Sequence, residues 1–416
     1  MTAAPTPIGG STLTGWRTPT IVILFGCVVA VIAFGPRSTL GLFLMPISSM
    51  NGWGREVMAF ALALQNLIWG LGQPFAGALA DRFGIIKVMW TGAILYAAGL
   101  ALMAVSTTPG MINLSAGVLI GLGLSGCSFP VVLAALGKIL PENWRGFAFG
   151  AGTAAGSFGQ FLFSPLAVLF MDAYGWQNAL YIFAVMTLMV MPFVLALAAP
   201  KANETRSSTG APQQSLVQAI REALGHRSYV LLVMGYFTCG FQLQFITIHM
   251  PPYLIDQGLS AQVGGWTIAI IGLFNIVGSL GSGWLSGIMP KRYLLSFIYG
   301  TRALAILVFI SVPVTTFTCL VFGAVMGLMW LSTVPPTTSL IALMFGTRWL
   351  ATLAGFAFFS HQVGGFLGVL IGGVAFEATG SYNLMWWLAI LFGVLSALIN
   401  LPIVEKPVAR PAMAAA

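Results

Sequence analysis

Two arginines of this 416-residue chain lie inside long apolar stretches, where no acidic residue is near them in sequence. Arg37 follows Pro36 in the first such stretch, and Arg302 lies about nine residues into a later one. All nine acidic residues lie in loops or at the ends of the apolar stretches. A charge at the centre of a bilayer costs at least ~2.5–3.5 kcal/mol and marks a functional site by default.

The chemistry that Arg37 offers is recognition of an anion. A planar guanidinium binds a carboxylate through two parallel hydrogen bonds, and Pro36 loosens the helix turn beside it. The alternative is a side chain that extends to the outer interface or bonds backbone carbonyls. Arg302 has the same two interpretations: a second anion site, or an arginine that ties its helix to carbonyls of its own half.

Uncharged polar side chains in the apolar stretches form a second set of candidates. His249 and His361 are the side chains there that titrate near neutral pH, so one of them is a candidate for carrying a coupling proton. The amides that are candidates for orienting a bound molecule are Asn66, Gln242, Gln244 and Asn275. All of these side chains are equally suited to hydrogen bonding between neighbouring helices. The sequence shows no nucleophile–base set, Walker loop or metal-ligand cluster, so we expect no catalytic residue, no cofactor and no metal.

The composition decides which elements must position these residues. Apolar residues make up 58% of the chain and charged residues only 6%, against roughly 25% charged in soluble domains. No soluble fold has enough interior for that much apolar side chain, so a soluble enzyme is excluded. A spanning helix needs about 20 mostly apolar residues. By that rule we predict an all-α membrane protein with twelve spans: 18–46, 54–79, 85–106, 111–137, 145–171, 177–199, 228–256, 262–287, 292–314, 317–344, 349–375 and 382–403.

The net charge of +8 is explained by orientation and not by nucleic acid. If the N-terminus is cytoplasmic, 14 of the 17 basic residues fall in cytoplasmic segments, as the positive-inside rule requires. We therefore expect both termini in the cytoplasm, and a bacterial inner membrane as the location. The apolar residues of the segment 216–224 have the spacing of a short amphipathic helix, which we expect to lie on the membrane surface.

The two halves of the chain repeat each other at a nearly constant distance. Met45-Pro46 and Met250-Pro251 are 205 positions apart, as are Phe161-Leu162 and Phe366-Leu367, and the same shift maps Arg37 onto Gln242. Parallel six-span repeats imply two pseudo-symmetric bundles facing each other across a site at the membrane midplane. The expected organisation is an N-terminus 1–17, a first bundle 18–200, a central loop 201–227, a second bundle 228–403 and a C-terminus 404–416.

The segment Gly77-Ala-Leu-Ala-Asp-Arg-Phe-Gly84, followed by Lys87, resembles the loop 2–3 signature of the major facilitator superfamily. The resemblance implies twelve helices, alternating access and a cytoplasmic charge latch between the bundles. It assigns the latch to Gly77, Asp81, Arg82, Gly84 and Lys87. The second copy of the signature has Gly287 in the place of the acid.

Gly35-Pro-Arg-Ser-Thr-Leu-Gly-Leu-Phe43 resembles the first span of the monocarboxylate transporter branch and its oxalate/formate antiporter relatives, where a substrate-sensing lysine occupies the slot of Arg37. The acid and arginine that this branch carries in span 8 are replaced here by Asn275 and Ser279. The resemblance implies a small organic anion as substrate, most simply a monocarboxylate, with proton symport as the energy source. Dicarboxylate/monocarboxylate exchange and proton-driven export of apolar compounds are the alternatives, and we expect a monomer.

Overall fold

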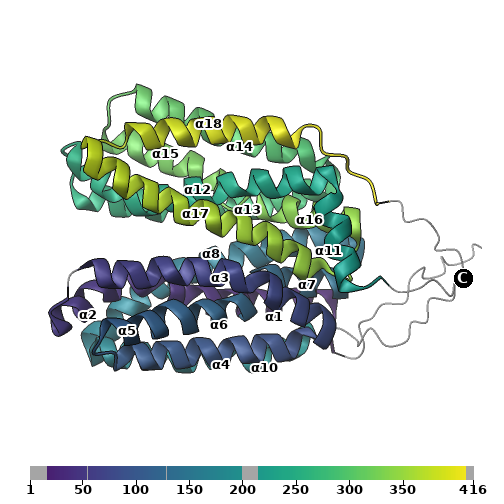
Figure 1. The fold of residues 1–416 in the computed structure, drawn as a ribbon, viewed down its shortest axis with the longest axis horizontal. Coiled ribbons are helices and arrows are strands. Elements are labelled where there is room, and N and C mark those ends of the chain that lie inside the picture. Colours follow the sequence, from purple (N-terminus) through teal and green to yellow (C-terminus); the bar gives the residue numbers. More distant parts are fainter. Residues whose placement is uncertain (1–15, 54, 128, 199–213, 409–416) are drawn as a thin grey trace, which may run out of the picture.

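A computed structural model describes residues 16–53, 55–127, 129–198 and 214–408, and these residues form helices without any strand. The helices form two bundles that lie side by side (Figure 1). The elements of the first bundle are α1 (Pro19–Thr39), η1 (Leu40–Phe43), α2 (Leu44–Asn51), α3 (Arg55–Phe83), α4 (Ile85–Ala104), α5 (Pro109–Ile112), η2 (Asn113–Leu119), α6 (Ile120–Cys127), α7 (Phe129–Ile139), α8 (Glu142–Tyr174), α9 (Trp176–Leu188), α10 (Val190–Val194) and η3 (Leu195–Leu197).

The second bundle follows a short connecting helix, α11 (Leu216–Gly225). Its elements are α12 (Arg227–Asp256), α13 (Ala261–Ile288), α14 (Lys291–Ser311), α15 (Thr316–Met329), α16 (Val334–Phe345), α17 (Leu350–Thr379) and α18 (Asn383–Asn400). Ten helical stretches within the described residues are long and apolar enough to cross a membrane. The helices α3 and α8, with 29 and 33 residues, complete the twelve that the sequence predicts.

Most predicted spans agree with the helices to within a few residues, and two of them end earlier for a local reason. The spans predicted to end at 314 and 403 stop at Ser311 and Asn400. Pro313 and Pro402 follow within two residues in each case. Val312, the residue before Pro313, is extended, as a following proline favours. Pro402 has no backbone N–H with which to continue the hydrogen bonding of α18.

The helix expected at 216–224 is present as α11, and its N-terminus is built by a capping box. The Ser215 side chain accepts from the backbone N–H of Gln218, and the Gln218 side chain accepts from the Ser215 backbone. This reciprocal pair satisfies two backbone donors that a helix start leaves free. Most of the expected N-terminus 1–17 and C-terminus 404–416 and the first part of the expected central loop 201–227 lie outside the described residues, which omit 1–15, 199–213 and 409–416.

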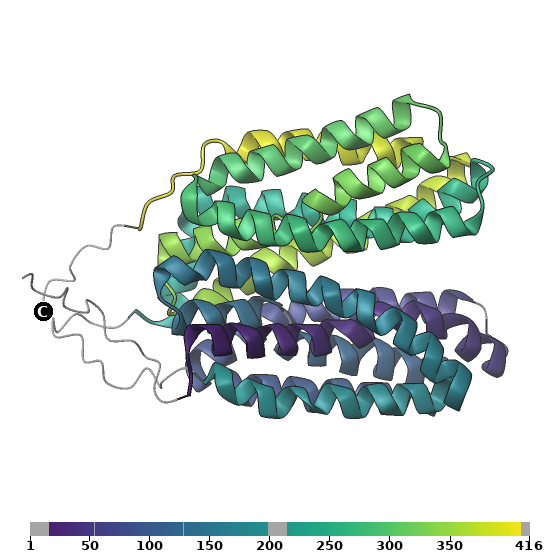
Figure 2. The ribbon, with the colours of Figure 1, turned by 180° about the vertical axis from the view of Figure 1, so that it is seen from behind.

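Both ends of the described chain and α11 lie at the same end of the molecule (Figures 1 and 2). Arg17 donates to the carbonyl of Ala196 at 3.2 Å, and the Val408 N–H donates to the carbonyl of Met344 at 2.9 Å. We call this the cytoplasmic end, because the predicted cytoplasmic segments carry most of the basic residues.

The two bundles touch along α3 with α17 and along α8 with α13. Glycines allow the close approach: a Cβ at Gly77 would lie 2.4 Å from the carbonyl oxygen of Ala351, and one at Gly150 would lie 2.7 Å from that of Ser279. Toward the middle of the membrane, the Gln362 amide donates to the carbonyl of Asn66 at 3.4 Å. The contacts thus cover the cytoplasmic halves of the helices, and the structure is closed at that end.

Candidate functional site

A central cavity lies between the bundles, with about 860 Å³ of empty space when the part open to solvent is included. Its lining comes from both bundles. The polar lining residues are Arg37, Gln160, Gln244, Thr247, Thr337, Thr338, His361 and Gln362. The aromatic lining residues are Phe34, Trp69, Tyr236, Trp330 and Phe358. A mainly apolar cavity with a few converging polar groups is the usual form of a small-molecule site.

Arg37 lies in the last turn of α1 and contributes the one cationic side chain among the lining residues that the structure describes. One of its terminal nitrogens donates to Oδ1 of Asn66 at 2.5 Å. Its guanidinium carbon lies 5.6 Å from the ring centre of Phe34 and 5.2 Å from that of Trp69. Neither of the two salt bridges in the described part of the chain involves Arg37. The guanidinium therefore enters the cavity with its charge unmatched by a carboxylate of the described residues.

The predicted amides and histidines fall into two groups in the structure. Gln244 and His361 line the cavity, and Asn66 reaches it through its hydrogen bond to Arg37. Gln242 is fully buried and donates to the carbonyl of Ala389, and His249 lies between Val369 and Tyr382 within the second bundle.

Asn275 connects the bundles at the edge of the cavity wall. Its Nδ2 donates to the Ser157 hydroxyl on α8 at 2.5 Å, and its Oδ1 accepts from the backbone N–H of Leu331 at 3.0 Å. Leu331 lies in the break between α15 and α16 and lines the cavity. Asn275 therefore supplies an acceptor to a backbone donor that the broken helix leaves free.

Arg302 lies away from the cavity lining, although its sequence context is like that of Arg37. It is fully buried and donates through Nε to the carbonyl of Met329 at 2.9 Å and through Nη2 to the carbonyl of Trp330. These carbonyls end α15, where the helix dipole places partial negative charge. Arg302 therefore stabilises the break between α15 and α16, and we do not include it in the proposed substrate site.

Replacing Arg302 with Met is expected to destabilise the fold. The carbonyls of Met329 and Trp330 would lose their donors, at a cost of about 1–3 kcal/mol for each unsatisfied group. Thermal unfolding in detergent, followed by tryptophan fluorescence, should show a clear fall in melting temperature. Arg302→Lys should be intermediate, because one ammonium replaces the planar fork. A melting temperature equal to that of the wild type in Arg302→Met would contradict this assignment.

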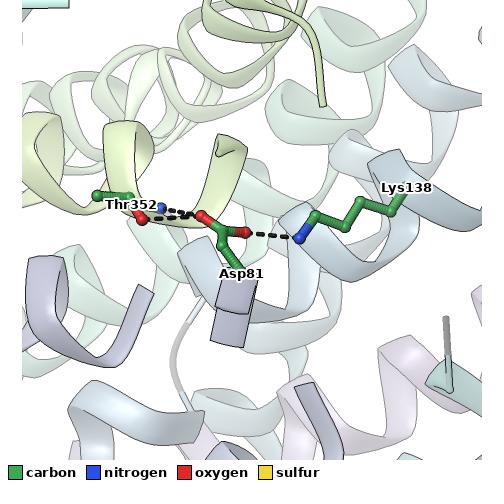
Figure 3. Close-up of polar contacts among 3 residues, drawn as sticks. All are labelled: Asp81, Lys138 and Thr352. Atoms are coloured by element: carbon green, nitrogen blue, oxygen red, sulfur yellow. Dashed lines mark hydrogen bonds and ion pairs between the residues drawn. The ribbon is translucent and has the colours of Figure 1, made fainter. Parts of the chain in front are cut away.

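Asp81 forms the polar contact that joins the bundles at the cytoplasmic end (Figure 3). Its Oδ1 lies 2.6 Å from Nζ of Lys138 on α7, in the same bundle. Its Oδ2 accepts from both the backbone N–H and the hydroxyl of Thr352 at 2.8 Å. Thr352 belongs to the first turn of α17 in the opposite bundle, where backbone N–H groups attract negative charge.

The structure places the residues of the predicted latch in two groups. Asp81 and Gly77 lie between the bundles, and the basic partner of Asp81 is Lys138, which is not part of the loop signature. Arg82 and Lys87 are exposed side chains, and Gly84 begins α4 with a φ of 97°. The reason is geometric, since Asp81 at the end of α3 points toward α7 and α17 and not along its own loop (Figure 3).

Several residues at these sites carry no signal in the sequence. Trp69 and Phe358 are aromatic residues in apolar helices, where packing against lipid is the ordinary expectation. Thr352 reaches Asp81 across 271 positions of the chain. Gln362 had the clearest available signal, because it is an amide next to His361 in an apolar stretch.

Known proteins resemble this chain over nearly its whole length. The "Uncharacterized MFS-type transporter YcxA" of Bacillus subtilis (strain 168) is 28% identical over 94% of this chain and 96% of its own length. Monocarboxylate transporter 13 of Rattus norvegicus is 24% identical over 93% of this chain and 89% of its own length.

Solved structures agree with this fold. The transporter FucP in the outward conformation has a TM-score of 0.72 at 16% identity, covering 92% of this chain and 99% of that one. The proton:xylose symporter XylE has a TM-score of 0.69 at 14% identity, covering 93% and 96%. The sequence profile of the Major Facilitator Superfamily matches residues 26–369. With two six-helix bundles around a central cavity, this chain belongs to the Major Facilitator Superfamily and is a multi-pass membrane transporter and not an enzyme.

Proposed function

We propose that this transporter carries a small organic anion, most simply a monocarboxylate, together with a proton by alternating access. The observation that carries the proposal is Arg37, a guanidinium in the central cavity without an acidic partner among the described residues. The name of Monocarboxylate transporter 13, whose similarity spans 93% of this chain, supports the same substrate class. The bacterial relative supports a bacterial cell membrane as the location.

The coupling follows from the cost of an unpaired charge. While the cavity is open, water can solvate the Arg37 guanidinium. When the cavity closes around it, the charge loses that water and needs a counterion, because burying an unpaired ion is costly. A bound carboxylate supplies the counterion. A proton that moves with it keeps the translocated load neutral overall.

Uptake into proteoliposomes tests the proposal directly. Purified protein is reconstituted, and the uptake of labelled acetate, lactate, benzoate and succinate is measured with and without an inward proton gradient. We expect saturable uptake of at least one monocarboxylate that the gradient accelerates. Exchange of succinate for a monoanion without gradient stimulation would favour the antiport alternative. Uptake of unrelated apolar compounds in place of acids would favour the exporter alternative.

His361 is the proposed carrier of the coupling proton, because it is the histidine that lines the cavity. Its Nδ1 lies 3.1 Å from Oε1 of Gln362, and its ring stacks on Phe358. The neighbouring Tyr236 and Cys239 face it from α12, and Arg37 lines the same cavity. His361→Gln is expected to abolish accumulation driven by the proton gradient while carboxylate exchange at equal pH continues.

His249→Gln is the matched control for this experiment. His249 lies outside the cavity lining, held by the carbonyl of Val369 at 3.0 Å and the Tyr382 hydroxyl at 3.3 Å. We expect it to keep gradient-driven accumulation. If His361→Gln accumulates substrate as well as the wild type does, the proton travels by another route.

A further inference from the structure

Five rings along the cavity form a continuous aromatic series: Phe34, Trp69, Phe358, His361 and Tyr236. Successive ring centres are 6.1, 4.9, 5.5 and 5.0 Å apart. Phe34 and Trp69 belong to the first bundle and the other three to the second. The series therefore crosses the cavity from one bundle to the other, and its rings lie within the 4.5–7 Å at which aromatic pairs attract each other.

The series begins at Arg37. Phe34 and Trp69 lie beside its guanidinium at 5.6 and 5.2 Å, and Asn66 accepts from one of its nitrogens. The remaining N–H donors are left to a bound carboxylate. Nε1 of Trp69 donates to Gln73 at 3.2 Å, which satisfies the polar atom of the indole and holds the ring in place. A carboxylate on Arg37 thus has the rest of its molecule beside the faces and edges of fixed aromatic rings.

We propose that the substrate is an aromatic monocarboxylate, with its carboxylate on Arg37 and its ring packed along the series beside Trp69 and Phe358. This inference rests on the proposed function and narrows its substrate class. A short acid such as acetate satisfies Arg37 but is too short to pack against the rings farther along the series. A dicarboxylate places a second charge among aromatic walls that offer no second arginine and no lysine in the described lining.

The substrate comparison that tests this proposal uses benzoate against cyclohexanecarboxylate, which has a ring of similar size without aromatic character. Aromatic contacts contribute beyond simple burial of area. We expect kcat/KM for benzoate to exceed that for cyclohexanecarboxylate by about tenfold, the upper range for one aromatic pair, and that for acetate by more. Succinate should be the poorest of the four acids. Equal kcat/KM for benzoate and cyclohexanecarboxylate in the wild-type protein would overturn the proposal.

The variants Trp69→Leu and Phe358→Leu test whether the preference for benzoate comes from these two rings. Each should bring the ratio of benzoate to cyclohexanecarboxylate close to one, because an aliphatic side chain offers similar area without a π-face. Trp284→Leu is the matched control, since Trp284 is 61% exposed on α13 and lies outside the cavity lining. It should keep the wild-type ratio. A ratio unchanged in Trp69→Leu and in Phe358→Leu would also overturn the proposal.

The outcomes separate this inference from the proposed function. Transport of acetate or lactate with no preference for benzoate would contradict the aromatic substrate class but remain consistent with a carboxylate transporter. Absence of uptake for every carboxylate would reject both. Because the substrate ratio is measured on the wild-type protein, the proposal stays testable even if a variant fails to fold.

Discussion

Replacing Arg37 with Gln is expected to lower kcat/KM for carboxylate uptake by about 10- to 150-fold. The range follows from the ~1.5–3 kcal/mol typical of hydrogen bonds to charged groups, at 1.4 kcal/mol for each factor of ten. Glutamine keeps a hydrogen-bonding amide in the cavity but removes the charge, so a closing cavity no longer needs a counterion there. The measurement is uptake of a labelled monocarboxylate into proteoliposomes over a range of concentrations.

Two further substitutions serve as comparisons for Arg37→Gln. Arg37→Lys keeps the charge but loses the planar fork, so an intermediate defect is expected. Arg348→Gln is the same chemical change at an exposed arginine near the start of α17, and it should transport normally. If Arg37→Gln takes up carboxylate with wild-type affinity, the guanidinium is not the anion site. Unimpaired transport of apolar compounds by that variant would favour the export alternative.

Replacing Gly77 with Ala is expected to open the cytoplasmic end. The added Cβ would lie 2.4 Å from the Ala351 carbonyl oxygen and 2.8 Å from the Thr352 nitrogen, so α3 and α17 must separate. Overpacking of this kind costs ~1–3 kcal/mol, which shifts a two-state equilibrium about 5- to 150-fold. The same separation would lengthen the hydrogen bonds from Thr352 to Asp81.

Distances between spin labels measure this shift. Labels are placed at Phe83→Cys and Tyr293→Cys, which lie at the cytoplasmic ends of opposite bundles and are exposed. A Cys27→Ser background removes the one partly exposed native cysteine of the described residues. Gly77→Ala should lengthen the mean distance and slow uptake. Gly281→Ala is the matched control, because a Cβ there meets no atom within 4 Å. Equal distance distributions in the two variants would mean that the Gly77 contact does not hold this end closed.

The helices could be predicted from the sequence because the bilayer imposes their length and composition. Each span must satisfy its backbone internally over about 20 apolar residues, so runs of that length identify helices without knowledge of their neighbours. Most predicted spans match the observed helices to within a few residues, with departures at Pro313, at Pro402 and in the break between α15 and α16, which interrupts the predicted span 317–344. The spacing of repeated motifs, being a property of the chain, indicated the two bundles in the same way.

The roles of the buried polar residues depended on the tertiary structure. Arg37 and Arg302 give the same signal in the sequence, a cation in an apolar stretch, yet one enters the cavity and the other bonds the carbonyls that end α15. The partners of Asp81 lie 57 and 271 positions away, on helices whose proximity no local pattern encodes. Hydropathy gives the free-energy cost of placing a side chain in lipid. The groups that offset this cost depend on which helix faces pack together.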